Sequence, residues 1–182
     1  MRTFIALKPD LNSCKKISFF RRDFLPSNIV KKLKIVDEIN IHLTLFFLGN
    51  YFNEENIKLL SSQIKLMNYT PVRFRCVKVG FFPSEVKPRV IWIAPDENAN
   101  EKIKQIYLSV KDILCSLNFN SEEDFSPHIT LARVRETLTK KDVDIIKDFK
   151  INDELCFEKL VLLKSTLTPL GSIYEEIVEA RG

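Results

Sequence analysis

The chain is 182 residues long and carries 28 basic against 24 acidic residues, a formal net charge of +4. Hydrophobic residues make up 45% and charged residues 29%, with only 4 Gly and 8 Pro, a soluble globular composition that excludes a disordered or collagen-like protein. The small basic excess is compatible with an anionic substrate but too small for an extended DNA-binding surface. No apolar stretch is long enough to span a membrane, and Lys8 interrupts the opening apolar run too early for a secretory signal. A cytoplasmic protein is therefore expected.

The first half of the chain alternates strand-like and helix-like patterns. β-branched and aromatic runs predict strands, and apolar residues at helical spacing predict helices. The segment Ile29–Ile39 is ambiguous. The expected elements are a strand over Thr3–Leu7, a helix over Ser13–Leu25, a strand over Ile41–Leu48, a helix capped by Asn53, and a strand over Val72–Phe82.

The second half repeats this mixture without the regular alternation of a doubly wound sheet, which favours an α+β fold. Its first strand should form a hairpin with Val72–Phe82, and a polar loop over Asn120–Asp124 should precede the next strand. The expected elements are a strand over Val90–Ala94, a helix over Asn98–Asn118, a strand over His128–Val134, a helix with the capping-box pattern Thr139-x-x-Asp142, and strands over Leu155–Lys164 and Ile173–Glu179.

The only two histidines occupy equivalent places in this order. His42 and His128 each begin a predicted strand, and the helix caps Asn53 and Thr139 each follow 11 residues later. A further strand follows each helix. This order predicts an internal duplication, with residues 1–182 forming a single domain of two similar lobes related by a pseudo-twofold axis.

Both histidines begin the pattern His, aliphatic, Thr, Leu. Because residues i and i+2 of a strand share a face, each His lies beside its own Thr, at Thr44 and Thr130. Imidazoles titrate near neutrality, so one can act as base and the other as acid, while hydroxyls can hold the oxygens of a tetrahedral anion. The matching chemistry is in-line displacement at phosphorus. A metal site is disfavoured because neither motif contains Asp or Glu.

The sequence resembles the two-histidine (2H) phosphoesterase superfamily, and within it the RNA 2′,3′-cyclic phosphodiesterases once called 2′-5′ RNA ligases. The resemblance spans nearly the whole chain in the right order. The matching blocks are Met1 to Leu7, His42-Leu43-Thr44-Leu45 through Gly49, Gly80-x-Phe82-Pro83 followed by Pro88 to Trp92, Phe125 to Arg133 with its His128-Ile129-Thr130-Leu131, and Leu167-x-Pro169-x-Gly171-x-x-Tyr174.

This resemblance implies a bilobal α+β fold, with two antiparallel sheets flanked by helices and a central groove. It implies metal-independent opening of RNA 2′,3′-cyclic phosphate ends to 2′-phosphates, without a cofactor. His42 and His128 would be the catalytic acid and base, and Thr44 and Thr130 would position the phosphate. The sequence does not say which His activates water. The expected partner is an RNA bearing a 2′,3′-cyclic phosphate end, and the protein is expected to be a monomer with no membrane association.

Two further positions, Phe47 and Arg133, each lie five residues after their histidine. Strict alternation would turn both away from the groove, with Phe47 in the core and Arg133 on a solvated face. A β-bulge could bring both back, where Phe47 could stack on the terminal base and Arg133 could contact the phosphate or base. Both are therefore candidate substrate-binding residues. Arg89 and the lysines Lys31, Lys32 and Lys34 could contact RNA or be solvated surface, and Trp92 is typical of a core position.

Two alternative functions remain open at this point. Ligation of a 5′-hydroxyl to the cyclic end as a 2′-5′ bond would use the same site with a different nucleophile. A non-catalytic RNA-end-binding module would keep the groove without needing both histidines. The four cysteines show no Cys-x-x-Cys pair and are expected to be reduced and mostly buried.

Overall fold

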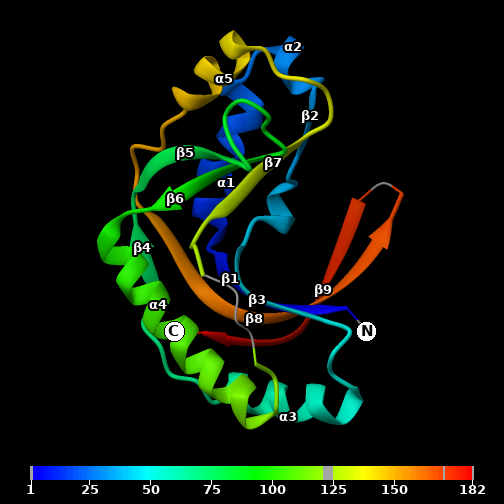
Figure 1. The fold of residues 1–182 in the computed structure, drawn as a ribbon. Helices are drawn as coiled ribbons and strands as arrows, with labels where there is room; N and C mark the ends of the chain where they lie inside the picture. The colour runs from blue at the N-terminus through cyan, green and yellow to red at the C-terminus, as the bar shows by residue number, and fades with distance from the viewer. Residues whose placement is uncertain (1, 121–124, 170, 182) are drawn as a thin grey trace.

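The computed structural model describes residues 2–120, 125–169 and 171–181 (Figure 1). Every strand pair in these ranges is antiparallel, and the helices lie between strands along the chain, which confirms the α+β class. In chain order the elements are β1 (Thr3–Pro9), α1 (Leu11–Phe19), the π-helix η1 (Phe20–Phe24), α2 (Ser27–Val30), β2 (Leu33–Ile35), the 3-10 helix η2 (Glu38–Asn40), β3 (Leu43–Gly49), α3 (Glu54–Lys65), β4 (Val72–Phe74), β5 (Cys76–Phe82), β6 (Val90–Pro95), α4 (Glu97–Ser116), β7 (Ile129–Val134), α5 (Lys140–Lys147), β8 (Leu155–Thr168) and β9 (Gly171–Arg181).

The nine strands found in the described ranges form one sheet with a mirrored strand order. The order is β4-β8-β1-β3-β7-β6-β5, with β2 also on β7 and β9 on β8. The first half-sheet is β8, β1 and β3 with the outer strands β4 and β9, and the second half-sheet is β7, β6 and β5 with β2. They meet through a single residue pair, Leu43 on β3 and Ile129 on β7. The two expected antiparallel sheets are thus the two halves of one sheet.

The half-sheets exchange strands between the two parts of the chain. β8 comes near the end of the chain, yet it pairs with β1 at the beginning. β5 precedes the midpoint, yet it pairs with β6 in the second half-sheet. The duplicated order read from the sequence is therefore present. However, β5 from the first part of the chain pairs in the second half-sheet, and β8 from the second part pairs in the first.

The helices α1, α3, α4 and α5 each begin where a side-chain cap satisfies a backbone N–H group. Asn53 accepts the N–H of Asn56 at 2.8 Å before α3, as the sequence predicts. Before α5, the Thr139 hydroxyl accepts the N–H of Asp142 and the Asp142 carboxylate accepts the N–H of Thr139, so the predicted capping box is confirmed. Such caps stabilise a helix by about 1 kcal/mol each.

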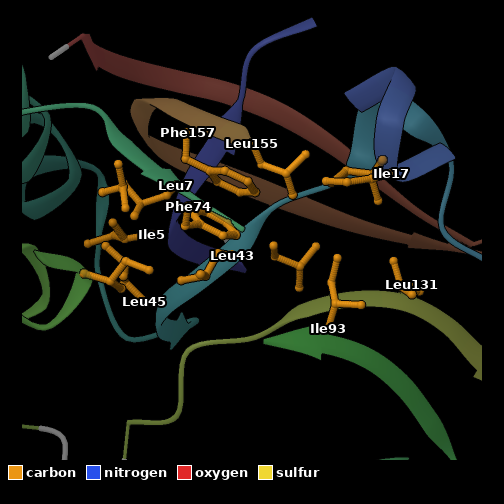
Figure 2. Packing of buried hydrophobic residues seen from close by; sticks show 14 of the residues in the cluster. Ile5, Leu7, Ile17, Leu43, Leu45, Phe74, Ile93, Leu131, Leu155 and Phe157 are labelled. Atoms are coloured by element: carbon orange, nitrogen blue, oxygen red, sulfur yellow. The ribbon is translucent and has the colours of Figure 1, made fainter. Parts of the chain in front are cut away.

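One face of the sheet is covered by helices and holds the main core (Figure 2). Ile5 and Leu7 of β1, Leu43 of β3 and Phe157 of β8 point into it, and Ile17 of α1 packs from the helix side. Because side chains alternate along a strand, the residues between these positions lie on the opposite face. That opposite face carries both His-x-Thr motifs.

The predicted strand over Val72–Phe82 is wrong in one respect, because it is two strands. β4 pairs with β8 in the first half-sheet, and β5 pairs with β6 in the second. The chain passes between them at Arg75, whose N–H donates to the Asp96 carboxylate at 2.9 Å. The break depends on this distant partner, and no Gly or Pro marks it in the sequence.

The remaining expectations concern loops, helices and cysteines. The ambiguous Ile29–Ile39 region contains the end of α2, the short strand β2 and the start of η2. Most of the expected loop over Asn120–Asp124 lies outside the described residues. Cys156 is buried as expected, but Cys115 is exposed because its side chain lies on the outer face of α4. Among the helices described, none combines the length and apolar character needed to cross a bilayer.

Candidate active site

His42 stands immediately before β3, on the face opposite the main core. Its Nδ1 lies 2.6 Å from the backbone oxygen of Asn40. A carbonyl oxygen only accepts hydrogen bonds, so Nδ1 carries the hydrogen and Nε2 is the atom left to exchange a proton. The ring lies between Phe4, at 5.1 Å between ring centres, and Tyr174, at 5.4 Å.

His128 stands immediately before β7 in the same relation to its strand. Its Nδ1 lies 2.8 Å from the backbone oxygen of Ser126, again two residues earlier in the chain. Its ring contacts Phe82 and Trp92, at 5.1 and 6.1 Å between ring centres. Each histidine is thus fixed in the same tautomer and flanked by two aromatic rings, although the rings come from unrelated positions.

The junction between the half-sheets brings the two motifs together. Leu43 pairs with Ile129 in antiparallel register, and continuing that register by one residue places His42 opposite Thr130 and Thr44 opposite His128. Directly opposite residues in an antiparallel pair are about 5 Å apart between Cβ atoms. We call His42, Thr44, His128 and Thr130 the quartet. All four are partly accessible, and their shared face leaves two imidazoles and two hydroxyls beside one another.

A β-bulge turns Phe47 onto the face of the quartet. In β3 the consecutive residues Leu45 and Phe46 are both buried. The pairing with β1 shifts at this point, so that Phe46 lies opposite Ile5 and Thr44 opposite Ala6. The extra residue restores the alternation with Phe47 on the side of Thr44. Its side chain is 65% exposed and its ring centre lies 6.0 Å from that of Phe4.

The second half-sheet contains the equivalent bulge. Leu131 and Ala132 of β7 are both buried, and the pairing with β6 shifts between Ile91 and Trp92. Arg133 is therefore exposed on the side of Thr130. Both i+5 residues lie on the quartet's face, and the strict alternation that would have turned them away does not hold.

Burial dominates the electrostatics of His42. It lowers the pKa of the imidazole to about 4, opposed by the hydrogen bond to Asn40 and reinforced by the positive charges of Lys8 and Arg133 and by His128. His42 is therefore neutral at pH 7 in the free protein. A pocket of about 140 Å³ opens beside it, lined by Lys8, Ile39, Asn40, Ile41, His42, Leu163, Tyr174 and Glu176.

Sequence reasoning missed the aromatic walls of the site. Trp92 was expected in the core, but its indole lies on the quartet's face of β6, stacked on Phe82 at 5.0 Å between ring centres. Phe4 and Tyr174 similarly flank His42 and pack against each other at 4.9 Å. The alternation of side chains along each strand could have indicated which of these aromatic residues face away from the core. It could not have shown that they surround the histidines, because the pairing of their strands is set by long-range contacts.

The other basic candidates separate into different environments. Lys32, between α2 and β2, forms an ion pair with Asp142 of α5 at 2.7 Å, so it holds these two parts of the fold together. Arg89 holds the β5–β6 hairpin through its backbone N–H, 2.7 Å from the oxygen of Phe82, while its side chain is exposed. Lys31 is exposed. Lys34 of β2 lies opposite Arg133 of β7.

Paired His-x-Thr strands at the junction of mirrored half-sheets define the class of two-histidine phosphoesterases. The model of the family described as "LigT like Phosphoesterase" matches residues 15–92 and again residues 93–174, one match for each half of the chain. The chain therefore belongs to the LigT-like phosphoesterase family.

Individual relatives agree with this assignment. A protein of Methanocaldococcus jannaschii named RNA 2′,3′-cyclic phosphodiesterase is 33% identical over 98% of this chain and 99% of its own length. One of Thermotoga maritima with the same name is 30% identical over 100% of this chain and 95% of its own. Among solved structures, Escherichia coli LigT in apo form has a TM-score of 0.76 at 20% identity, covering 100% of this chain and 98% of LigT. The same LigT has also been solved with 3′-AMP, with a TM-score of 0.73 at 22% identity over 98% of this chain and 95% of LigT.

Proposed function

We propose that the protein hydrolyses RNA 2′,3′-cyclic phosphate ends to 2′-phosphates by acid–base catalysis without a metal ion. The observation that carries the proposal is the quartet, in which two imidazoles, each held through Nδ1 by a backbone oxygen, lie on one face with two hydroxyls. The name shared by the relatives in M. jannaschii and T. maritima supports the choice of substrate. The 3′-AMP complex of E. coli LigT supports a nucleotide site on this fold.

The proposed reaction is an in-line displacement at phosphorus. Water forms a P–O bond as the P–O3′ bond breaks, which leaves the phosphate on the 2′-oxygen. One imidazole takes a proton from the water, and the other gives a proton to the departing 3′-oxygen. The Thr44 and Thr130 hydroxyls donate hydrogen bonds to the non-bridging oxygens, where negative charge builds up in the transition state.

His42 is proposed as the base and His128 as the acid. A base must be unprotonated before the reaction, and the low pKa of His42, about 4, provides that state across the neutral range. We expect kcat/KM to rise with pH through a limb near 4, well below the usual range of a histidine. A pH–rate profile from pH 3.5 to 9 checks this, and an acidic limb near 6.5 would contradict the role of His42.

A substrate with a better leaving group separates the two roles. A sulfur atom in place of the 3′-oxygen departs without protonation, so the general acid is no longer needed. The variant His128→Ala should therefore regain most of its lost rate on the 3′-thio substrate, whereas His42→Ala should not. The reverse pattern would exchange the two assignments.

Phe47 and Arg133 complete the proposed substrate site. The exposed ring of Phe47, supported by Phe4, offers a flat surface on which the terminal base can stack. The Arg133 guanidinium can contact a substrate phosphate. The substrate is proposed to be an RNA end recognised by its phosphate and sugar, with the protein acting as a monomer.

The decisive experiment is turnover of a short RNA ending in a 2′,3′-cyclic phosphate, with EDTA present throughout. We expect a 2′-phosphate product from the wild type, and a loss of about 10²–10⁴-fold in kcat for His42→Ala and for His128→Ala. Lys102→Ala, on the exposed side of α4, is the control and should retain full activity. A 3′-phosphate product, or activity abolished by EDTA, would contradict the proposal.

The same assay separates the alternative functions. An added RNA with a 5′-hydroxyl would be joined to the cyclic end through a 2′-5′ bond if the site acts as a ligase. An RNA-end-binding module would bind the cyclic end without forming product, and binding would persist in both alanine variants.

A further inference from the structure

Two positively charged residues stand directly opposite each other beyond the quartet. Lys34 of β2 pairs with Arg133 of β7 in antiparallel register. Their neighbours in the same register, Leu33 with Val134 and Ile35 with Ala132, pack against the main core. Alternation therefore places Lys34 and Arg133 on the other face, the face of the quartet.

This arrangement is unfavourable for the free protein. Like charges directly opposite in a strand pair destabilise the sheet. In the ranges that the structure describes, neither Lys34 nor Arg133 forms an ion pair with a carboxylate. A bound anion would remove the repulsion, and a phosphate oxygen can accept charge-assisted hydrogen bonds from both side chains.

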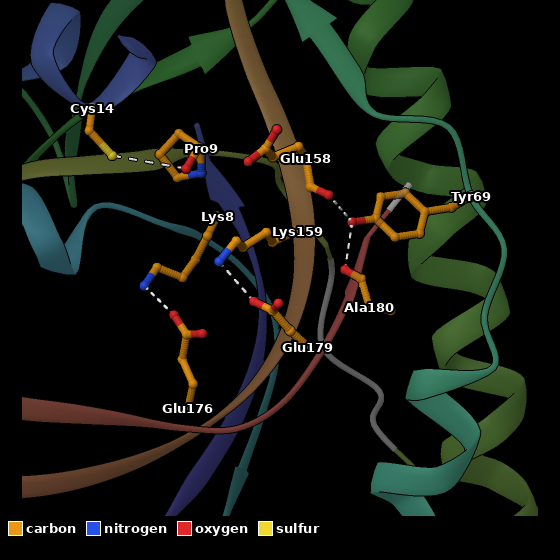
Figure 3. Close-up of polar contacts among 9 residues, drawn as sticks. All are labelled: Lys8, Pro9, Cys14, Tyr69, Glu158, Lys159, Glu176, Glu179 and Ala180. Carbon is orange, nitrogen blue, oxygen red and sulfur yellow. Dashed lines mark hydrogen bonds and ion pairs between the residues drawn. The ribbon is translucent and has the colours of Figure 1, made fainter. Parts of the chain in front are cut away.

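In the first half-sheet, by contrast, lysines on this face form ion pairs with carboxylates. Lys8 pairs with Glu176 at 2.6 Å, and Lys159 pairs with Glu179 at 2.8 Å, both through carboxylates of β9 (Figure 3). Carboxylates of β9 thus neutralise the positive charges of Lys8 on β1 and Lys159 on β8. The contrast concentrates the available positive charge of this face on the second half-sheet.

The Lys34–Arg133 pair lies close to the reacting groups. Arg133 follows Thr130 by three residues of β7, a span of about 10 Å at most for an extended chain. Its charge is felt at His42, where it contributes to lowering the pKa of the imidazole. A phosphate held by Lys34 and Arg133 would therefore be a neighbour of the reacting phosphate along the RNA chain.

We propose that Lys34 and Arg133 together bind the phosphodiester that precedes the terminal nucleotide, so that the site selects RNA chains over cyclic mononucleotides. The inference rests on the proposed function, because it assigns the path of the RNA strand leading to the same quartet. The chain enters over β2 and β7 of the second half-sheet. The paired lysines of the first half-sheet do not contact its backbone.

The test compares two substrates in the same enzyme: a cyclic mononucleotide, which lacks the second phosphate, and a short oligonucleotide with the same cyclic end. Lys34→Ala should lower kcat/KM for the oligonucleotide about tenfold and leave the mononucleotide value within twofold. Lys34→Arg should restore the oligonucleotide value. Lys159→Ala removes a lysine from the same face of the other half-sheet and should change neither value.

Two accompanying measurements separate substrate binding from folding. The slope of log kcat/KM against log salt for the oligonucleotide should become shallower by about 0.7 in Lys34→Ala, as expected for the loss of one phosphate contact with a single strand. The variant should unfold at or slightly above the wild-type temperature, because it loses the repulsion with Arg133.

Each outcome bears on the proposal. An equal loss on both substrates would place Lys34 at the reacting phosphate, and no loss on either would leave the Lys34–Arg133 pair without a role; either result overturns the inference while the proposed function stands. Absence of turnover on both substrates by the wild type would overturn the proposed function, and the inference with it.

Discussion

His42 links the candidate active site to the stability of the fold. Burial lowers its pKa to about 4 in the folded protein, whereas the unfolded chain has the ordinary value near 6.5. As pH falls from about 6.5 to about 4, the unfolded state takes up a proton that the folded state does not bind. Stability due to neutral His42 is therefore present above pH 6.5 and is lost over this interval.

The variant His42→Asn isolates this effect, because an amide can keep the hydrogen bond to the Asn40 oxygen without titrating. Between pH 7 and pH 4.5, the free energy of unfolding of the wild type should fall by about 1–2 kcal/mol more than that of His42→Asn. Urea denaturation at both pH values measures the difference. Equal losses would show that the imidazole is not desolvated in the folded protein.

At the residue scale, the sequence was most informative where chemistry and pattern coincided. The repeated His-x-Thr identified the quartet because imidazole and hydroxyl side chains at i and i+2 have few structural reasons to recur. The orientation of Phe47 and Arg133 depended on a bulge in each strand. A bulge arises from the register with a neighbouring strand, so the residues alone could only offer it as a possibility.

At the scale of the elements, Gly80 positions the wall beside His128. A Cβ at this residue of β5 would lie 2.2 Å from the Trp92 ring, which rests flat on the glycine backbone. Gly80→Ala must therefore displace the indole from its stack with Phe82. We expect altered fluorescence of this single tryptophan and a loss of about tenfold in kcat, because the ring contacts that orient His128 are disturbed.

Gly49→Ala provides the matched control. Gly49 ends β3 with a φ of +57°, and a Cβ there would meet nothing within 4 Å. The substitution should cost about 1 kcal/mol of stability through backbone strain while leaving tryptophan fluorescence and kcat unchanged. If both alanine variants lost activity alike, the contact between Gly80 and Trp92 would have no specific role.

Helix ends were predictable at this scale, but strand partners were not. Asn53 and the Thr139–Asp142 box act within a few residues, so their local pattern determines where α3 and α5 begin. The division between β4 and β5 depends instead on the Arg75–Asp96 hydrogen bond and on two different partner strands. An apolar run cannot show that its two ends pair with opposite halves of the sheet.

At the scale of the whole molecule, strand exchange makes the two parts of the chain interdependent. A fragment of residues 1–87 would contain β1 without β8, and β5 without β6. The fragment 88–182 would contain β8 without β1, and β6 without β5. Neither should fold alone, because each would leave the edges of its central strands unpaired and their apolar faces uncovered.

Circular dichroism and thermal unfolding of the two fragments test this expectation. Each alone should show no cooperative transition, and mixing them should restore one, along with activity. The intact chain should unfold in a single transition, as a single domain of two lobes requires. A fragment that folded independently would show that the lobes are separate folding units.

The exchange of β5 and β8 also has a consequence for how such a chain arose. A polypeptide of half this length could complete the mirrored sheet only by lending its last strand to a second copy and receiving one in return. The aliphatic residue after its histidine would then have paired with the same residue of the partner at the symmetry axis, as Leu43 now pairs with Ile129, and each histidine would have faced the partner's threonine. The ancestor implied by this topology is a strand-swapped homodimer with one shared active centre. After gene fusion the two motifs could diverge. The His42 motif now lies in the half-sheet whose Lys8 and Lys159 are ion-paired, and the His128 motif lies beside the Lys34–Arg133 pair.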